Sequence, residues 1–380
     1  MPAVTDVLIV GGGPVGLYLG ALLLQHGVAV RILEKRTGRN PHTRAIGIHP
    51  PALSALDRIG AASPLIARGI PIRRGRAVWL GQEIAHMPFA PVSERYPFVL
   101  AVPQPVTEAV LEARLLELDG GALVRGAQVT DMHDDGGRVT ADATVAGTRR
   151  RFSASLAVGA DGANSTVRRL LCVPAAERRY PDHYLMGDFP DSSPYGEDAA
   201  LFLEAGGIVE SFPLPGGVRR WVVRLSRPPD RPDPHLLAGL VGDRTGIALD
   251  AGSNSMLSSF GVRSRLAARM VAGRTALIGD AAHEISPIGG QGMNLGWLDA
   301  ESLAPVILAA LHSRPSGADL RRFNASRRRA AAGAKRQAEV NMALGRPLPD
   351  GLLRMRNAAI ARIGAAPALN AHVARRFTMQ

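Results

Sequence analysis

The hydrophobic pattern begins with a short β-branched run, residues 7–10, that is apolar at every position. Such a run is typical of a strand buried on both faces of a sheet. Residues 17–26 carry five leucines and are followed by Gly27, which predicts a helix and its end. A second apolar run, residues 28–33, leads to Glu34. The chain therefore starts with a predicted strand, glycine-rich turn, helix and second strand, and an acid follows the second strand.

The pattern changes further along the chain. Residues 176–264 are rich in proline and aromatic residues and contain short alternating runs, which is typical of an antiparallel sheet. The segments before and after them return to buried strands and amphipathic helices. We predict helices over 51–58, 106–118, 235–240, 295–311, 318–344 and 352–363, and strands near 78–80, 84–89, 123–124, 127–132, 139–145, 151–158, 201–203, 208–212, 221–225 and 275–280.

These elements predict an α/β fold with a Rossmann-like parallel sheet, a mixed or antiparallel second sheet and C-terminal helices. We expect one discontinuous dinucleotide-binding domain built from residues 1–70, 98–175 and 265–340. Residues 71–97 and 176–264 are expected to form a substrate-binding β-sheet domain, and residues 341–380 a C-terminal helical segment.

The glycine-rich stretch Gly11-Gly12-Gly13-Pro14-Val15-Gly16 carries the first chemical signal. Gly11 permits a tight turn, Gly13 lets the backbone approach a pyrophosphate, and Gly16 lets the helix pack close to the strand. Free N–H groups at the helix start then attract phosphate. Glu34 lies where an acid accepts hydrogen bonds from ribose hydroxyls. This spacing predicts a dinucleotide site but leaves open which dinucleotide binds.

Charge changes this picture little. The 380 residues contain 45 Lys and Arg against 33 Asp and Glu, a formal net charge of +12, which is compatible with a nucleic-acid partner. Nearly all of the excess is arginine, as a GC-rich genome would produce, because Lys35 and Lys335 are the only lysines. The arginine clusters at 149–151 and 327–329 are not interleaved with aromatic residues for stacking. We therefore expect a solvated basic surface and no nucleic-acid partner.

The cysteine content and the hydrophobic pattern disfavour two further classes of protein: those with disulfides or cysteine metal sites, and those that are inserted into or exported across a membrane. Cys172 is the only cysteine, which excludes disulfides within the chain and cysteine-based metal sites, and we expect no metal. No apolar run reaches the roughly 18–20 residues of a membrane span, and the first residues lack the basic region of a signal peptide. A cytoplasmic location fits this sequence.

Two downstream motifs narrow the choice of dinucleotide. One is Gly159-Ala160-Asp161-Gly162, and the other joins Gly279-Asp280-Ala281-Ala282-His283 to Gly289-Gly290-Gln291-Gly292-Met293-Asn294. With the first glycine stretch and Glu34, they resemble the three signature segments of single-component FAD-dependent aromatic hydroxylases, the para-hydroxybenzoate hydroxylase-like flavoprotein monooxygenases. The resemblance covers roughly residues 5–345.

The resemblance implies a role for each segment. Glu34 would bind the ribose of the AMP half of FAD, Asp280 the ribityl and pyrophosphate region, and residues 289–294 the isoalloxazine. Asp161 belongs to the segment associated with both FAD and NAD(P)H. The expected cofactor-binding residues are Gly11, Gly13, Pro14, Val15, Gly16, Glu34, Lys35, Arg36, Arg44, Gln104, Asp161, Gly279, Asp280, Pro287, Gly290, Gly292, Met293 and Asn294.

The chemistry implied by the resemblance belongs to the flavin, so we assign no catalytic side chain. Pro287, Gly289 and His283 are expected to border the reaction chamber, although for His283 a structural or flavin-supporting role is favoured over acid–base catalysis. Two of five aromatic residues of the second domain are expected to line the substrate pocket. The five are Trp79, Tyr184, Phe202, Phe212 and Trp221.

The resemblance implies a monooxygenase that consumes NAD(P)H and inserts one oxygen atom of O₂, through a flavin C4a-hydroperoxide, into an electron-rich substrate. Hydroxylation of an aromatic or polyketide-like small molecule is the first expectation, with epoxidation and Baeyer–Villiger insertion as alternatives. NAD(P)H is expected to bind transiently, because there is no second GxGxxG motif. The remaining alternative is a non-redox cyclase or binding protein on the same fold. We expect a monomer or a homodimer.

Overall fold

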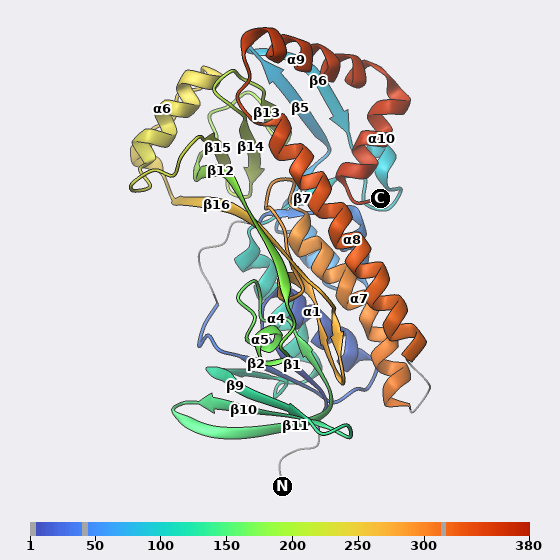
Figure 1. The fold of residues 1–380 in the computed structure, drawn as a ribbon. Coiled ribbons are helices and arrows are strands. Elements are labelled where there is room, and N and C mark those ends of the chain that lie inside the picture. Colours follow the sequence, from blue (N-terminus) through green and yellow to red (C-terminus); the bar gives the residue numbers. More distant parts are fainter. Residues whose placement is uncertain (1–4, 40–44, 313–316) are drawn as a thin grey trace.

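The structure, a computed structural model, describes residues 5–39, 45–312 and 317–380. Strand β1 lies inside a mixed eight-stranded sheet with the order β17-β18-β11-β1-β2-β8, and β9 and β10 extend it from β11 (Figure 1). The strands are β1 Thr5–Val10, β2 Val30–Glu34, β8 Leu123–Arg125, β9 Ala127–Asp134, β10 Val139–Val145, β11 Thr148–Gly159, β17 Val271–Ala272 and β18 Thr275–Leu277. Strands β18, β11, β1, β2 and β8 are parallel to one another, as the apolar runs predict.

Helices pack against the parallel sheet, and the antiparallel strands β9 and β10 share its hydrophobic core, which explains why β1 is apolar throughout. Val7, Leu8 and Ile9 are fully buried, and α1 packs against β2, α4 and α7. The helices of this part are α1 Pro14–Gln25, α2 Pro50–Asp57, α3 Ala62–Ile66, α4 Gln104–Leu118, α5 Thr166–Leu170 and α7 Gln291–Leu311, with the 3₁₀ turn η3 Gly279–Ala281. Helix α7 starts at Gln291, four residues before its predicted start, because Gly290 at its N-cap adopts a left-handed conformation.

The second sheet has the order β19-β16-β12-β15-β14-β13-β5-β6 and is antiparallel except between β13 and β5. Its strands are β5 Arg74–Trp79, β6 Gln82–Pro88, β12 Ala175–Pro190, β13 Ala199–Phe202, β14 Val209–Leu214, β15 Val218–Leu225, β16 Met256–Ala267 and β19 His283–Glu284. Helix α6 Pro234–Thr245 packs on one face, near the 3₁₀ turn η2 Ala251–Ser253. A small third sheet has the order β3-β7-β4 and consists of β3 Gly47–Ile48, β4 Ile70–Ile72 and β7 Val99–Ala101. The 3₁₀ turn η1 Ala90–Val92 precedes β7 in the chain.

Helix α8 Gly317–Leu344 runs along both parts of the molecule (Figure 1). Phe323 near its start belongs to the core around the parallel sheet, whereas Met342 near its end belongs to a cluster under the antiparallel sheet. The prediction of one final helix over 352–363 is wrong, since α9 Asp350–Ala365 is followed by α10 Pro367–Phe377. The helical conformation is interrupted at Ala366, because a residue that precedes a proline is disfavoured from helical backbone angles.

Candidate functional site

The first glycine stretch forms the turn between β1 and α1. Gly11 has a φ of +111°, and a Cβ there would lie 2.3 Å from the Ala160 carbonyl oxygen. A Cβ on Gly16 would lie 2.0 Å from the Gly11 carbonyl oxygen, so helix and turn touch at this position. No atom of the described residues lies within 4 Å of a Cβ placed on Gly13, which faces an open cavity. Two glycines are therefore needed for packing, and Gly13 leaves room for a ligand.

The Glu34 side chain is hydrogen-bonded to this turn. Its carboxylate accepts hydrogen bonds from the Gly12 N–H at 2.6 Å and from the Arg36 N–H and Nε at 2.9 and 2.8 Å. Burial alone raises the pKa of Glu34, but the hydrogen bonds from Arg36 and Gly12 outweigh it and hold the pKa below its ordinary value. Glu34 is thus an ionised acceptor fixed at the edge of the cavity, where a ribose hydroxyl can donate to its remaining lone pairs.

Asp161 organises the start of α5, at the second motif. It accepts hydrogen bonds from the Ser165 Oγ at 2.5 Å and the Thr166 N–H at 2.6 Å, and Ser165 caps the helix by accepting from the Arg168 N–H. Arg168 in turn donates to the Ala281 carbonyl at 2.7 Å. The second motif is therefore tied to the third, and Asp161 also lines the cavity.

In the third motif, Asp280 and His283 face different surroundings. The His283 Nε2 lies 2.5 Å from the Asp299 carboxylate, which also accepts from the Gly279 N–H and the Arg327 Nε. Burial lowers the pKa of His283, but Asp299 outweighs this and raises it, while His283 and Arg327 lower the pKa of Asp299 against its own burial. This cluster is fully buried outside the cavity, so His283 braces the motif and does not border the chamber.

Asp280 lies at the cavity. Its side chain is surrounded by protein but exposed to the cavity interior, and burial raises its pKa to about 6. A donor from a bound molecule would stabilise its ionised form.

The side-chain amide of Asn294 fixes the glycine loop before α7. The Asn294 Nδ2 donates to the carbonyls of Gly47 and Gly290 at 2.9 and 2.6 Å, and its Oδ1 accepts from the His49 N–H at 2.8 Å. Gly289 and Gly290 have φ values of 94° and 65°, a conformation that favours glycine. Asn294 is fully buried and off the cavity, so its role in the structure is to fix the loop whose backbone faces the cavity.

His49 lies directly beside this loop. A Cβ on Gly290 would be 3.5 Å from the His49 Nε2, and the His49 Nδ1 has no hydrogen-bond partner among the described residues. Burial lowers the pKa of His49 to about 4, so its imidazole is neutral at neutral pH. On the other side, the Asn341 amide of α8 is 2.7 Å from a Cβ placed on Gly289. The loop is thus confined on both sides by polar groups.

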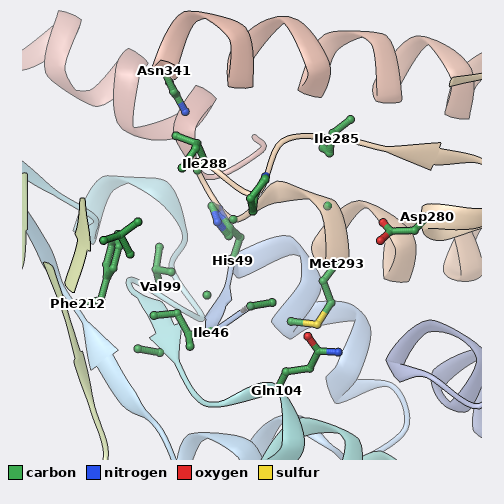
Figure 2. Close-up of a pocket in the computed structure, with 18 of the residues that line it drawn as sticks. Ile46, His49, Val99, Gln104, Phe212, Asp280, Ile285, Ile288, Met293 and Asn341 are labelled. Atoms are coloured by element: carbon green, nitrogen blue, oxygen red, sulfur yellow. The ribbon is translucent and has the colours of Figure 1, made fainter. Parts of the chain in front are cut away.

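One continuous cavity of about 1560 Å³ joins these segments. It extends from Gly13 and Glu34 past the Gly289 loop to an apolar chamber under the antiparallel sheet. Figure 2 shows Phe212 on one side of the cavity and Asp280 on the other, with His49 between them. An elongated ligand with a polar and an apolar end fits this shape.

Among the five aromatic residues named as candidates for the pocket lining, only Phe212 lines the cavity, so the expectation of two is wrong. Strand alternation explains the result, because Phe202 and Trp221 point to the opposite face of the sheet and pack near α6. Tyr184 is fully buried against Phe260 and does not line the cavity.

The structure brings most of the predicted cofactor residues to one cavity. Those that line it are Gly11, Gly13, Pro14, Val15, Glu34, Lys35, Arg36, Gln104, Asp161, Gly279, Asp280, Pro287, Gly290, Gly292 and Met293, together with Gly289. Gly16, His283 and Asn294 lie outside the lining, and Arg44 lies outside the described residues.

Sequence reasoning missed His49, Glu108, Glu210 and Asn341, all of which line the cavity. Glu108 follows Gln104 by one helical turn and accepts its amide hydrogen bond at 2.9 Å. The signal for Glu210 was available, because it is a charged residue at an inward position of an alternating strand.

The residues present fit a flavin dinucleotide. The open face at Gly13 and the ionised Glu34 suit a pyrophosphate and a ribose, and the Gly289 loop presents unhindered backbone toward the apolar chamber. Fold and site together define a dinucleotide-binding flavoprotein with a second, substrate-binding sheet. The family model described as "FAD binding domain" matches residues 4–338, so the chain belongs to this family, and FAD is its cofactor.

Known relatives agree with this assignment. The chain is 32% identical over 316 residues to 6-methylpretetramide 4-monooxygenase of Streptomyces rimosus, covering 80% of this chain and 56% of that relative. The chain thus spans little more than half the length of that enzyme. Its homologues include FAD-dependent aromatic monooxygenases, which confirms the predicted family.

Solved structures confirm the fold class. The crystal structure of p-nitrophenol 4-monooxygenase from Pseudomonas putida DLL-E4 matches with a TM-score of 0.90 and 25% identity, covering 100% of this chain and 99% of that one. The Diels–Alderase PyrE3 of pyrroindomycin biosynthesis matches with a TM-score of 0.83 and 25% identity, covering 98% and 80%. In the parts of the chain that the structure describes, no helix is long and apolar enough to cross a membrane.

Proposed function

We propose that this protein is an NAD(P)H-consuming FAD monooxygenase that places one oxygen atom of O₂ on an aromatic or polyketide-like small molecule. Hydroxylation is the primary reaction, and a monomer or homodimer in the cytoplasm is the proposed working state. The observation that carries the proposal is the single cavity that joins the dinucleotide turn to an apolar chamber at the Gly289 loop.

Each part of the chain has a distinct task in this proposal. Gly13 and the N–H groups at the start of α1 would hold the pyrophosphate, and Glu34, fixed by the Gly12 N–H, would hold the ribose of the AMP half. Bound FAD would supply hydride acceptance from NAD(P)H and the activation of O₂. Backbone N–H groups at the start of α7 stabilise negative charge beside them, because the helix dipole adds to their hydrogen bonds.

The antiparallel sheet supplies the place for the substrate. Phe212, Val222 and Leu201 line the chamber from adjacent strands and exclude water from it. Neutral His49 adjoins the loop without adding charge. The chamber is therefore suited to hold a planar apolar molecule against the loop.

Reduction and product analysis test this proposal. Purified holoprotein is mixed anaerobically with NADH or NADPH and a panel of phenolic and polyketide candidates, and flavin bleaching is followed by stopped flow. Products formed under ¹⁸O₂ are then weighed by mass spectrometry. A substrate-accelerated bleaching and one ¹⁸O atom per product support the proposal. A flavin that no pyridine nucleotide reduces in the presence of any candidate contradicts it.

A second candidate is a non-redox cyclase, which the similarity to the Diels–Alderase PyrE3 favours. FAD would then shape the chamber without a redox cycle. Such an enzyme converts its substrate to a product of equal mass with no nicotinamide nucleotide present. The same mass measurement separates the two functions, because a monooxygenase product is heavier by one oxygen.

A further inference from the structure

One acidic side chain interrupts the apolar wall of the chamber. Glu210 on β14 is paired with Leu201 on one side and Val222 on the other, and all three line the cavity. The same row continues through Met186 to Ser258 across β12 and β16. Glu210 is the only charged residue in this row, and it lies near the middle of the sheet that faces the chamber.

Glu210 is buried without a partner. Glu210 is only 8% exposed, and no described residue forms a hydrogen bond or ion pair with it. The arginines nearest in the neighbouring strand are already paired, since Arg220 binds both oxygens of Asp188 and Arg224 binds Asp182. Burial raises the pKa of Glu210 to about 7, which reflects the lack of compensating groups.

An unpartnered buried carboxyl group costs stability, so its presence in a binding chamber points to a ligand group that completes it. A ligand carboxylate would be repelled by the ionised form of Glu210, and the arginines nearby are matched by their own acids. An ammonium group is disfavoured because it carries three donors, and Ser258 is the only polar member of the row besides Glu210. A neutral hydroxyl group needs only one acceptor, which Glu210 supplies in either protonation state.

We propose that Glu210 is a specificity-determining residue that accepts a hydrogen bond from a hydroxyl group of a neutral, extended aromatic substrate. This inference rests on the proposed function, which makes the bound molecule a substrate, and it names the chemical class of that substrate. The chamber selects hydroxylated ring systems over their methyl ethers and over carboxylated analogues.

Ligand binding to the oxidised holoprotein tests the inference without turnover. The probes are 2-naphthol, 2-methoxynaphthalene and 2-naphthoate, and binding is measured by perturbation of the flavin absorbance spectrum. Wild-type protein is expected to bind 2-naphthol about tenfold more tightly than the ether, the ratio that one hydrogen bond of this kind contributes. 2-Naphthoate is expected to bind most weakly at pH 8.

Two variants locate the effect. Glu210→Leu is expected to bind both neutral probes equally, whereas Glu210→Gln keeps an acceptor oxygen, retains the preference for 2-naphthol and binds 2-naphthoate more tightly than wild type does. Glu197→Gln, at an exposed glutamate before β13, is the matched control and should behave as wild type. FAD content and far-UV circular dichroism confirm that each variant is folded.

Equal binding of the two neutral probes by wild-type protein overturns the inference, as does an unchanged preference in Glu210→Leu. Tighter binding of 2-naphthoate than of 2-naphthol also overturns it. Failure of the proposed function shows differently, as a flavin that no pyridine nucleotide reduces. The binding measurement uses neither NAD(P)H nor O₂, so the two failures are distinguishable.

Discussion

Replacing Gly13 or Gly16 with alanine adds the same methyl group three residues apart, with different expected effects. At Gly13 the methyl group meets no atom within 4 Å in the part of the chain that the structure describes, and the backbone angles of −81° and −179° suit alanine. At Gly16 it would lie 2.0 Å from the Gly11 carbonyl oxygen. Since that obstacle is backbone, the start of α1 would have to move away from the turn.

These geometries set the expected magnitudes. Gly13→Ala should leave the apoprotein within about 1 kcal/mol of wild type, because the lower chain entropy of alanine offsets its poorer N-cap. Gly16→Ala should gain up to about 1 kcal/mol of helix propensity but lose about 3 kcal/mol to overpacking, a net loss of about 2 kcal/mol. FAD affinity should fall about hundredfold in Gly13→Ala, because the methyl group occupies the approach to the pyrophosphate.

Urea unfolding of the apoprotein, followed by circular dichroism, measures the stability of each variant, and FAD titration measures affinity. Gly136→Ala is not a suitable control because its φ is positive, whereas Gly333 in α8 has open space and ordinary helical backbone. Gly333→Ala should therefore lower neither the FAD affinity nor the free energy of unfolding. The reasoning is refuted if Gly13→Ala binds FAD as wild type does, or if apo Gly16→Ala is as stable as wild type.

Three other substitutions probe groups around the cavity. Asp299→Asn should lower the free energy of unfolding in urea by about 3 kcal/mol, because it leaves Arg327, whose side chain is only 13% exposed, without its counter-charge; a loss below about 1 kcal/mol would contradict this. Asn294→Leu should cost about 2–3 kcal/mol in the same assay, since three backbone groups lose their partner, and should weaken FAD binding. Burial raises the pKa of Glu210 from 4.5 to about 7, so the folded state binds the extra proton between these values and wild-type stability falls as pH rises through them, by about 3 kcal/mol at most. Glu210→Gln should flatten that part of the stability–pH curve, and identical curves for both proteins would contradict the assignment.

Local sequence signals located the dinucleotide turn well because its requirements are local. The order strand, Gly11 to Gly16, helix and strand follows from residue spacing and backbone freedom alone. The end of the strand predicted over 275–280 was less accurate, since β18 stops at Leu277 and Asp280 lies in a 3₁₀ turn. Apolar runs indicate burial, and they do not indicate where the chain leaves the sheet.

Residues whose role depends on distant partners could not be assigned from sequence. For His283 the sequence favoured a structural or flavin-supporting role over acid–base catalysis, but only the fold places its partners Asp299 and Arg327 around it. Asn294 belongs to the expected flavin segment, yet its amide is used by groups some 245 residues away in the chain. Such pairings arise from packing between elements, which spacing in one segment does not encode.

Helix α8 gives the molecule a mechanical property that neither sheet has alone. Phe323 and Met342 sit on one uninterrupted helix but belong to the cores of the two different sheets. Because a helix propagates cooperatively, loosening one core frays the segment that supports the other. The two sheets should therefore unfold in a single transition.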